Sequence, residues 1–170
     1  MFELRPLQPD SVPRALEKAE RYRLLNEPRE AESICRDILR ADASNEAAIV
    51  IMLLALTDQF GMGVRVSVNH ARELIDRMSD PYHQAYYEGI LSERWGKHLM
   101  EEGAPGYTVF DWFTAAMKCF ARAIELAPDG NEDAVLRWNT CARMIKRHDL
   151  RPRPEEGVEE AEYFDEVPRR

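Results

Sequence analysis

The stretch that decides the fold is AAMKCFARAIELAPDG, residues 115–130. In it, Ala116, Phe120 and Ala123 follow one another at intervals of four and three residues, and Pro128 comes five residues later. This spacing places the three apolar residues on one face of a helix. The small residue lets a second helix approach closely, and the larger residue one turn later fills the space beside it. We therefore predict a tightly paired helix that ends at the proline.

The same spacing recurs twice earlier in the chain. The stretch EAESICRDILRADASN, residues 30–45, carries Ala31, Cys35, Ile38 and Ala43 at the same offsets. A third copy carries Ala71, Ile75 and Met78, with its proline arriving early at Pro81. Self-similarity of this kind is typical of helical repeats, in which each unit buries its apolar face against the next.

On both sides of these stretches, up to about residue 148, apolar residues recur at intervals of three and four residues. This spacing predicts helices joined by short turns. Ser11, the stretch Asp42 to Asn45, and Asp80 precede helical patterns and are expected to cap them. Glycine and proline mark the other breaks. Val64 to Val68 alternates like a strand but is too short, so we expect a loop there. The predicted helices are 12–25, 28–41, 45–59, 65–79, 81–101, 108–127 and 131–147.

These segments resemble tetratricopeptide (TPR) repeats over roughly residues 12 to 147. The resemblance implies an all-α fold, with a right-handed stack of about three helix hairpins and a C-terminal capping helix. The chain departs from the family pattern, since Ala71 follows Ala31 by forty residues and Ala116 follows Ala71 by forty-five, against about thirty-four in the family. Lys18 and Glu88 also occupy positions that are apolar in the family. A generic helical bundle is the alternative fold.

The resemblance further implies a concave groove, lined by the first helix of each hairpin, that binds a partner protein or peptide. One branch of the family grips a C-terminal carboxylate with lysine and asparagine from these helices, and the corresponding faces here lack that pattern. The expected ligand is instead a helix or extended peptide of mixed apolar and charged character. The residues expected to line the groove are Leu16, Glu20, Arg23, Val50, Leu54, Asp58, Tyr86, Ile90 and Arg94.

Composition narrows the function classes. The net charge of -8 argues against nucleic acid as a partner, because phosphate binding needs clustered lysine and arginine. No apolar stretch reaches the roughly 18 residues of a membrane span, and the N-terminus does not resemble a secretory signal. The three cysteines are far apart and odd in number, which fits reduced thiols in a cytoplasmic protein.

No grouping of residues predicts catalysis. The four histidines are scattered, and the His70–Glu73 and His98–Glu101 pairs would hold a metal only if they converged. Gly61-Met62-Gly63 lacks the rest of a phosphate loop and is expected to form a turn. We therefore expect neither an enzyme nor a cofactor.

The last part of the chain differs in character. We divide the sequence into a lead-in (1–11), a helical domain (12–148) and an acidic tail (149–170), which we expect to be flexible. Within the tail, Tyr163 and Phe164 could dock on the protein's own surface or on a partner.

The sequence as a whole favours an adaptor or assembly subunit that binds a partner protein. Two alternatives stay open at this point. One is a small chaperone dedicated to a specific client protein. The other is a helical-bundle metal protein.

Overall fold

The protein is all-α. A computed structural model describes residues 2–62 and 67–154, and no strand occurs in these ranges. A short 3-10 turn, η1 (Pro9–Ser11), precedes the α-helices. These are α1 (Val12–Leu24), α2 (Pro28–Ala41), α3 (Glu46–Asp58), α4 (Val68–Ile75), α5 (Pro81–Glu101), α6 (Gly106–Leu126) and α7 (Asp133–Arg147).

The helix boundaries follow the signals in the sequence closely, with two corrections. Asn45 caps α3 by accepting a hydrogen bond from the Ala48 N–H at 3.0 Å, and Asp80 caps α5 through the Tyr82 N–H at 2.9 Å. The predicted cap at Ser11 is wrong, because this residue closes the 3-10 turn and its side chain makes no capping bond. The fourth helix also stops at Ile75, since the next residues form turns.

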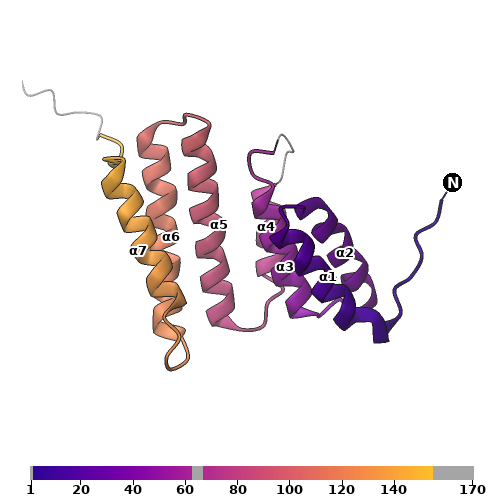
Figure 1. Ribbon diagram of the computed structural model, residues 1–170. Coiled ribbons are helices and arrows are strands. Elements are labelled where there is room, and N and C mark those ends of the chain that lie inside the picture. The colour runs from indigo at the N-terminus through magenta and orange to yellow at the C-terminus, as the bar shows by residue number, and fades with distance from the viewer. Residues whose placement is uncertain (1, 63–66, 155–170) are drawn as a thin grey trace, which may run out of the picture.

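The helices pack in chain order, side by side (Figure 1). Each helix contacts the next one along the chain, and in addition α1 touches α3, α3 touches α5, and α5 touches α7. The lead-in leaves from one end of the row, next to α1, and α7 lies at the other end. This order brings the faces of the four odd-numbered helices next to one another.

The spacing of small and large residues has the role expected from the sequence. Ala31, Ala71 and Ala116 are all fully buried. The residues one turn later and those that follow are buried as well, namely Cys35, Ile38, Ile75, Met78, Phe120 and Ala123. In the α5–α6 pair, Gly89 leaves room for the Phe120 ring. Small residues thus set the distance between paired helices.

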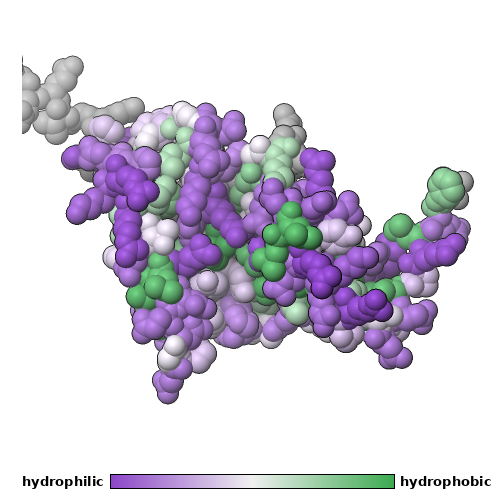
Figure 2. All heavy atoms as spheres, in the orientation of Figure 1, coloured by the Kyte–Doolittle hydropathy of each residue, from purple (hydrophilic) through white to green (hydrophobic). Residues whose placement is uncertain are grey.

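The core divides into two main clusters. The first joins α1 to α4, including Leu53, Leu56 and Leu74, and takes in Leu91 of α5. The second joins α5 to α7 around Phe113 and Phe120, and Leu54 of α3 packs against it. Helix α3 is apolar on nearly every side because neighbours cover it on several faces. The surface is mostly hydrophilic, with hydrophobic patches near the end of α1 and at the lower end of the α6–α7 hairpin (Figure 2).

Candidate functional site

A chain of charged side chains links the first three odd-numbered helices. Asp58, the last residue of α3, accepts from Arg23 of α1 at 3.1 Å through Oδ2 and from Arg94 of α5 at 2.5 Å through Oδ1. All three side chains are about one-fifth exposed, so their interaction is only partly screened by water. Three of the residues expected to line the groove therefore meet at one point.

Arg94 is held by more than its ion pair. Its Nη1 also donates to the Thr57 hydroxyl at 2.6 Å and to the Leu54 carbonyl at 3.2 Å. Burial lowers the pKa of Arg94 below its ordinary value, and the Asp58 carboxylate opposes that effect. The guanidinium consequently fixes α5 against the C-terminal end of α3.

A second charged group links α5 to α7. Glu93 is fully buried, and its Oε1 accepts from Lys97, one turn on, and from Arg137 of α7 at 3.5 Å. Burial lowers the pKa of Arg137, but the Glu93 carboxylate and the Tyr86 side chain outweigh this and raise the pKa above its ordinary value. The other oxygen of Glu93, Oε2, has no hydrogen-bond partner among the described residues. A buried carboxylate persists only because cations surround it.

The two charged groups border one open hollow of about 320 Å³. It lies where α3 ends against α5 and α7, and it presents both signs of charge beside an aromatic ring. A ligand seated there would meet carboxylates, guanidinium groups and apolar surface together. The lining residues are Thr57, Asp58, Phe60, Arg94, Lys97, His98, Glu101 and Arg137.

The other residues predicted for the groove lie in several environments. Ile90 is only 1% exposed and packs in the second core cluster, so its predicted place on the groove surface is wrong. Leu16, Val50 and Leu54 are half-buried and pack against core clusters. Glu20 is exposed on α1.

Tyr86 is half-buried in the second cluster rather than freely exposed. Its ring stacks on Tyr82 at 5.8 Å between centroids and meets Tyr87 edge-on at 5.2 Å. Its side chain nevertheless reaches Arg137, and it therefore lies at the border of the charged group.

Sequence reasoning missed Lys97 and Arg137. Lys97 follows Glu93 by four residues, a spacing that favours an ion pair and could have been recognised. Arg137 lies on the same side of α7 as the buried Ala134 and Cys141, so a basic residue on an otherwise apolar face was the available signal.

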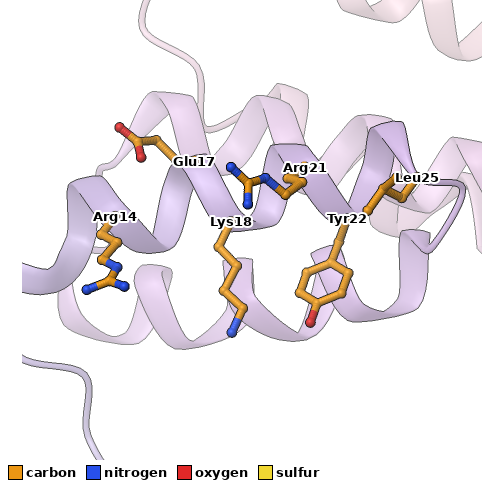
Figure 3. Close-up of a pocket in the computed structure, with 6 residues that line it drawn as sticks. All are labelled: Arg14, Glu17, Lys18, Arg21, Tyr22 and Leu25. Carbon is orange, nitrogen blue, oxygen red and sulfur yellow. The ribbon is translucent and has the colours of Figure 1, made fainter.

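Two further surfaces carry clustered charged side chains. The residues Arg14, Glu17, Lys18, Arg21, Tyr22 and Leu25 line a strip that comes from α1 alone, and Arg14, Lys18 and Tyr22 point to the same side of it (Figure 3). A hollow of about 330 Å³ between α2 and α4 is rimmed by Arg36, Arg40, His70 and Arg77. The strip comes from one helix, and the second hollow, to which Met52 of α3 also contributes, has only basic residues and histidine among its charged lining. The hollow beside Arg94 presents both signs of charge, so it is the better candidate.

The two histidines considered as metal ligands lie apart. His98 borders the hollow beside Arg94, where its ring packs on Trp95 at 5.0 Å, while His70 lines the hollow between α2 and α4. Over residues 2–62 and 67–154, no three His, Cys, Asp or Glu side chains gather closely enough to hold a metal ion.

Two other expectations concern the membrane and the tail. Among the described helices, none combines the length and apolar character that crossing a bilayer requires. Tyr163 and Phe164, the residues predicted to dock, lie outside the described residues.

Comparison with known proteins adds no relative. No family model matches the chain, and neither the curated proteins nor the solved structures contain a match.

Proposed function

We propose that this chain is a TPR-type adaptor, which binds a partner protein or peptide along the face formed by α1, α3, α5 and α7. In this reading, α1–α2, α3–α4 and α5–α6 are three stacked hairpins in a right-handed stack, and α7 is the capping helix. The order of helix contacts supports it, because each odd-numbered helix touches the next odd-numbered one. A stack of this kind leaves one continuous surface for a ligand.

The observation that carries the proposal is the convergence of charged side chains from all four odd-numbered helices. Arg23, Asp58 and Arg94 form one linked group, and Arg137 meets Glu93 beside it. Charged groups that line an open hollow steer a partner and fix its register more than they add raw affinity. A partner segment with both acidic and basic residues and an apolar anchor matches this surface.

The experiment begins with the partner that co-purifies from the native cell, identified by mass spectrometry and then prepared in pure form. Reversing Arg94 would be a poor test, since that side chain also fixes α5 to α3. Two exposed carboxylates serve better: Glu20 on α1 and Glu101 beside the hollow. We expect E20K/E101K to weaken binding by about tenfold or more, a loss of about 1.4 kcal/mol.

The matched control is the charge reversal E73K, which lies on the exposed face of α4, an even-numbered helix. It should bind the partner with unchanged affinity, and all variants should keep the same melting temperature. Equal affinity of E20K/E101K and the unmodified protein would remove the groove as the binding surface.

A further inference from the structure

The hollow between α2 and α4 has an apolar floor and a basic rim. Both helices pack on α3, and the hollow of about 330 Å³ opens between them. This volume is at the lower end of the range of small-ligand sites, about 300–1,000 Å³. Leu39, Met52 and Leu74 form the floor. The rim consists of Arg36, Arg40, His70 and Arg77, and no carboxylate lines the hollow.

The charge of this lining is the reverse of the charge of the whole chain. The protein has 31 acidic residues against 23 lysines and arginines, so three arginines and a histidine without an acidic neighbour in the lining are a local inversion. Asp37 and Glu73 lie on the same two helices but do not line the hollow. Like charges gathered in this way repel one another, and an anion placed among them would remove that repulsion.

One carboxylate lies at the border of the hollow, and it is already bound. Glu32 is close enough to His70 to be affected by its charge. Its Oε1 accepts from Arg36, and its Oε2 accepts from Gln59 Nε2 at 2.8 Å. Burial raises the pKa of Glu32, but the hydrogen bonds from Gln59 and Arg36 outweigh this and hold the pKa below its ordinary value. Glu32 therefore compensates Arg36 and leaves the other two arginines of the rim without a counter-charge.

These two arginines, Arg40 and Arg77, are exposed and keep N–H groups for a ligand. Arg40 forms no ion pair with any other residue in the ranges 2–62 and 67–154. Arg77 donates through one Nη2 to the Ala43 carbonyl, which ties the chain after α4 to the turn before α3. A guanidinium has five N–H donors in a planar fork, and this fork matches two oxygens of a phosphate group.

The combination of rim and floor selects the class of ligand. A carboxylate has two oxygens and is satisfied by one arginine, whereas a terminal phosphate has three oxygens and nearly two negative charges at pH 7. Several arginines therefore suit the phosphate better. In the floor, Met52 and Leu74 are 4% and 2% exposed and offer only apolar contact. They suit a carbon group that is attached to the phosphate.

We propose that the hollow between α2 and α4 binds a phosphate monoester. The terminal oxygens accept hydrogen bonds from Arg40 and Arg77, and the esterified organic group lies on the apolar floor. Two sources present this chemistry, namely a small soluble phosphate ester and a phosphorylated side chain of a protein. No residue predicted for the groove lines this hollow, so the proposal does not depend on the adaptor function.

The other two charged surfaces are less suited to a phosphate, because both contain carboxylates. Glu17 lies within the strip on α1. Asp58 and Glu101 line the hollow beside Arg94. A doubly charged anion would be repelled by these groups, so the hollow between α2 and α4 is the favoured place.

The first test measures the affinity of the full-length protein for phenyl phosphate by isothermal titration calorimetry. Inorganic phosphate lacks the organic group and should bind about tenfold more weakly, because the apolar floor is left uncovered. Phenyl sulfate has a similar shape but a single charge, and it should also bind about tenfold more weakly. The proposal is overturned if phenyl phosphate does not bind at about 10 mM, or if the three compounds bind equally.

The second test removes charge from the rim. Arg40→Gln with Arg77→Gln should weaken the binding of phenyl phosphate by about tenfold or more. Arg40→Gln alone, which keeps the bond from Arg77 to Ala43, should weaken it about threefold or more and covers the case in which the double variant is less stable.

The matched control is Arg122→Gln with Arg143→Gln, which removes the same charge from exposed positions on α6 and α7. This control should bind phenyl phosphate as the original protein does. An equal loss of affinity in R40Q/R77Q and in the control would mean that only the overall charge matters, and it would contradict the proposal.

The third test locates the ligand by the ring-proton resonances of the histidines. Addition of phenyl phosphate should shift the Cε1 proton of His70, which the variant His70→Gln identifies. His98, which lines the hollow beside Arg94, should not respond. A shift at His98 without one at His70 would place the ligand in the wrong hollow and contradict the proposal.

A capped alanine peptide that contains one phosphotyrosine distinguishes the two sources. If it binds about tenfold more tightly than phenyl phosphate, the flanking chain adds contacts and the source is a phosphorylated protein. Equal or weaker binding assigns the hollow to a small ester. An oligonucleotide without a terminal phosphate carries only phosphodiesters, and tighter binding of that probe than of phenyl phosphate would contradict the proposal.

Discussion

At the residue scale, Gly89 shows how closely α5 and α6 are packed. A Cβ atom at this position would lie 2.5 Å from Cε1 of the Phe120 ring, which is fully buried and has no space into which to move. Alanine normally stabilises a helix relative to glycine by about 0.5–1 kcal/mol. Here the steric conflict should exceed that gain.

We therefore expect Gly89→Ala to lower the free energy of unfolding by about 1–3 kcal/mol, as overpacking does. Urea unfolding followed by circular dichroism measures it. Gly106→Ala is the control, since a Cβ there meets only Leu150 at an ordinary 3.8 Å, and this variant should be as stable as the original protein. A stabilised G89A protein would show that α5 and α6 are not in this contact.

Cys35 and Cys141 couple stability to alkaline pH. Burial raises the pKa of each thiol from 9.0 to about 12, and the carboxylates of Glu32 and Glu93 add to the shift at Cys35 and Cys141 respectively. Both thiols stay protonated in the folded protein above pH 9, while the unfolded chain releases its protons. Stability is therefore fully present below pH 9 and falls as the pH rises toward 12.

We expect each thiol to reduce stability by about 1 kcal/mol between pH 8 and pH 10. The measurement compares urea unfolding at the two pH values for the original protein and for Cys35→Ala with Cys141→Ala. The double variant should be less stable at pH 8 because of lost packing, but it should lose less stability on going to pH 10. An identical loss in both proteins would mean that the thiols are not buried in this way.

At the scale of single elements, the N-termini of the helices show which side-chain caps contribute to stability. Asn45 and Asp80 accept hydrogen bonds from backbone N–H groups at the starts of α3 and α5, whereas Ser11 makes no such bond before α1. All three residue types are favoured caps, so the sequence alone does not separate them. The difference arises because Ser11 takes part in the 3-10 turn.

We expect Asn45→Ala to lower the free energy of unfolding by about 1 kcal/mol, because the Ala48 N–H loses its partner. Ser11→Ala should change it by less than about 0.5 kcal/mol. Thermal unfolding of both variants tests the pair, and an equal effect of the two substitutions would contradict the assignment of caps.

The helices themselves were predictable from the sequence, because spacing of three and four residues and strong turn residues both mark them. Six of the seven predicted helices are found with ends shifted by no more than two residues. The fourth was predicted too long, since Met78 continues the apolar spacing and is indeed buried, although the chain there is a turn. Burial and helix continuation are separate properties, and the pattern reports only the first.

At the scale of the whole molecule, the candidate site was predictable only in part. Arg23, Asp58 and Arg94 were identified because each lies on the expected face of its helix, and they do meet. Ile90 was misplaced because a face predicted from spacing does not show how far the neighbouring helix covers it. Arg137 was missed because its role depends on Glu93 of another helix, which no local pattern contains.

The same long-range pairs join the two halves of the molecule. The first core cluster lies mainly in α1 to α4 and the second mainly in α5 to α7, with Leu91 and Leu54 packing across the boundary, where Asp58 also holds Arg94. Stability in stacked helices is a sum of unit and interface contributions, so a weaker interface lets the units unfold separately. Removing the negative charge at Asp58 leaves two partly buried arginines beside each other without their shared partner.

We expect Asp58→Asn to lower the free energy of unfolding by about 1–3 kcal/mol, the smaller values reflecting partial exposure to water. It should also separate two probes. Trp95 touches Phe60 and Trp112 lies under Arg72, so both rings also report the boundary between the halves. In a W95F/W112F background the remaining Trp138 of α7 follows the second half, while circular dichroism follows every helix. The two urea transitions should coincide in the original protein and diverge in D58N.

Glu30→Gln, which neutralises an exposed carboxylate on α2, is the control and should keep the two transitions coincident. Coincident transitions in D58N would show that the charged chain does not couple the two halves.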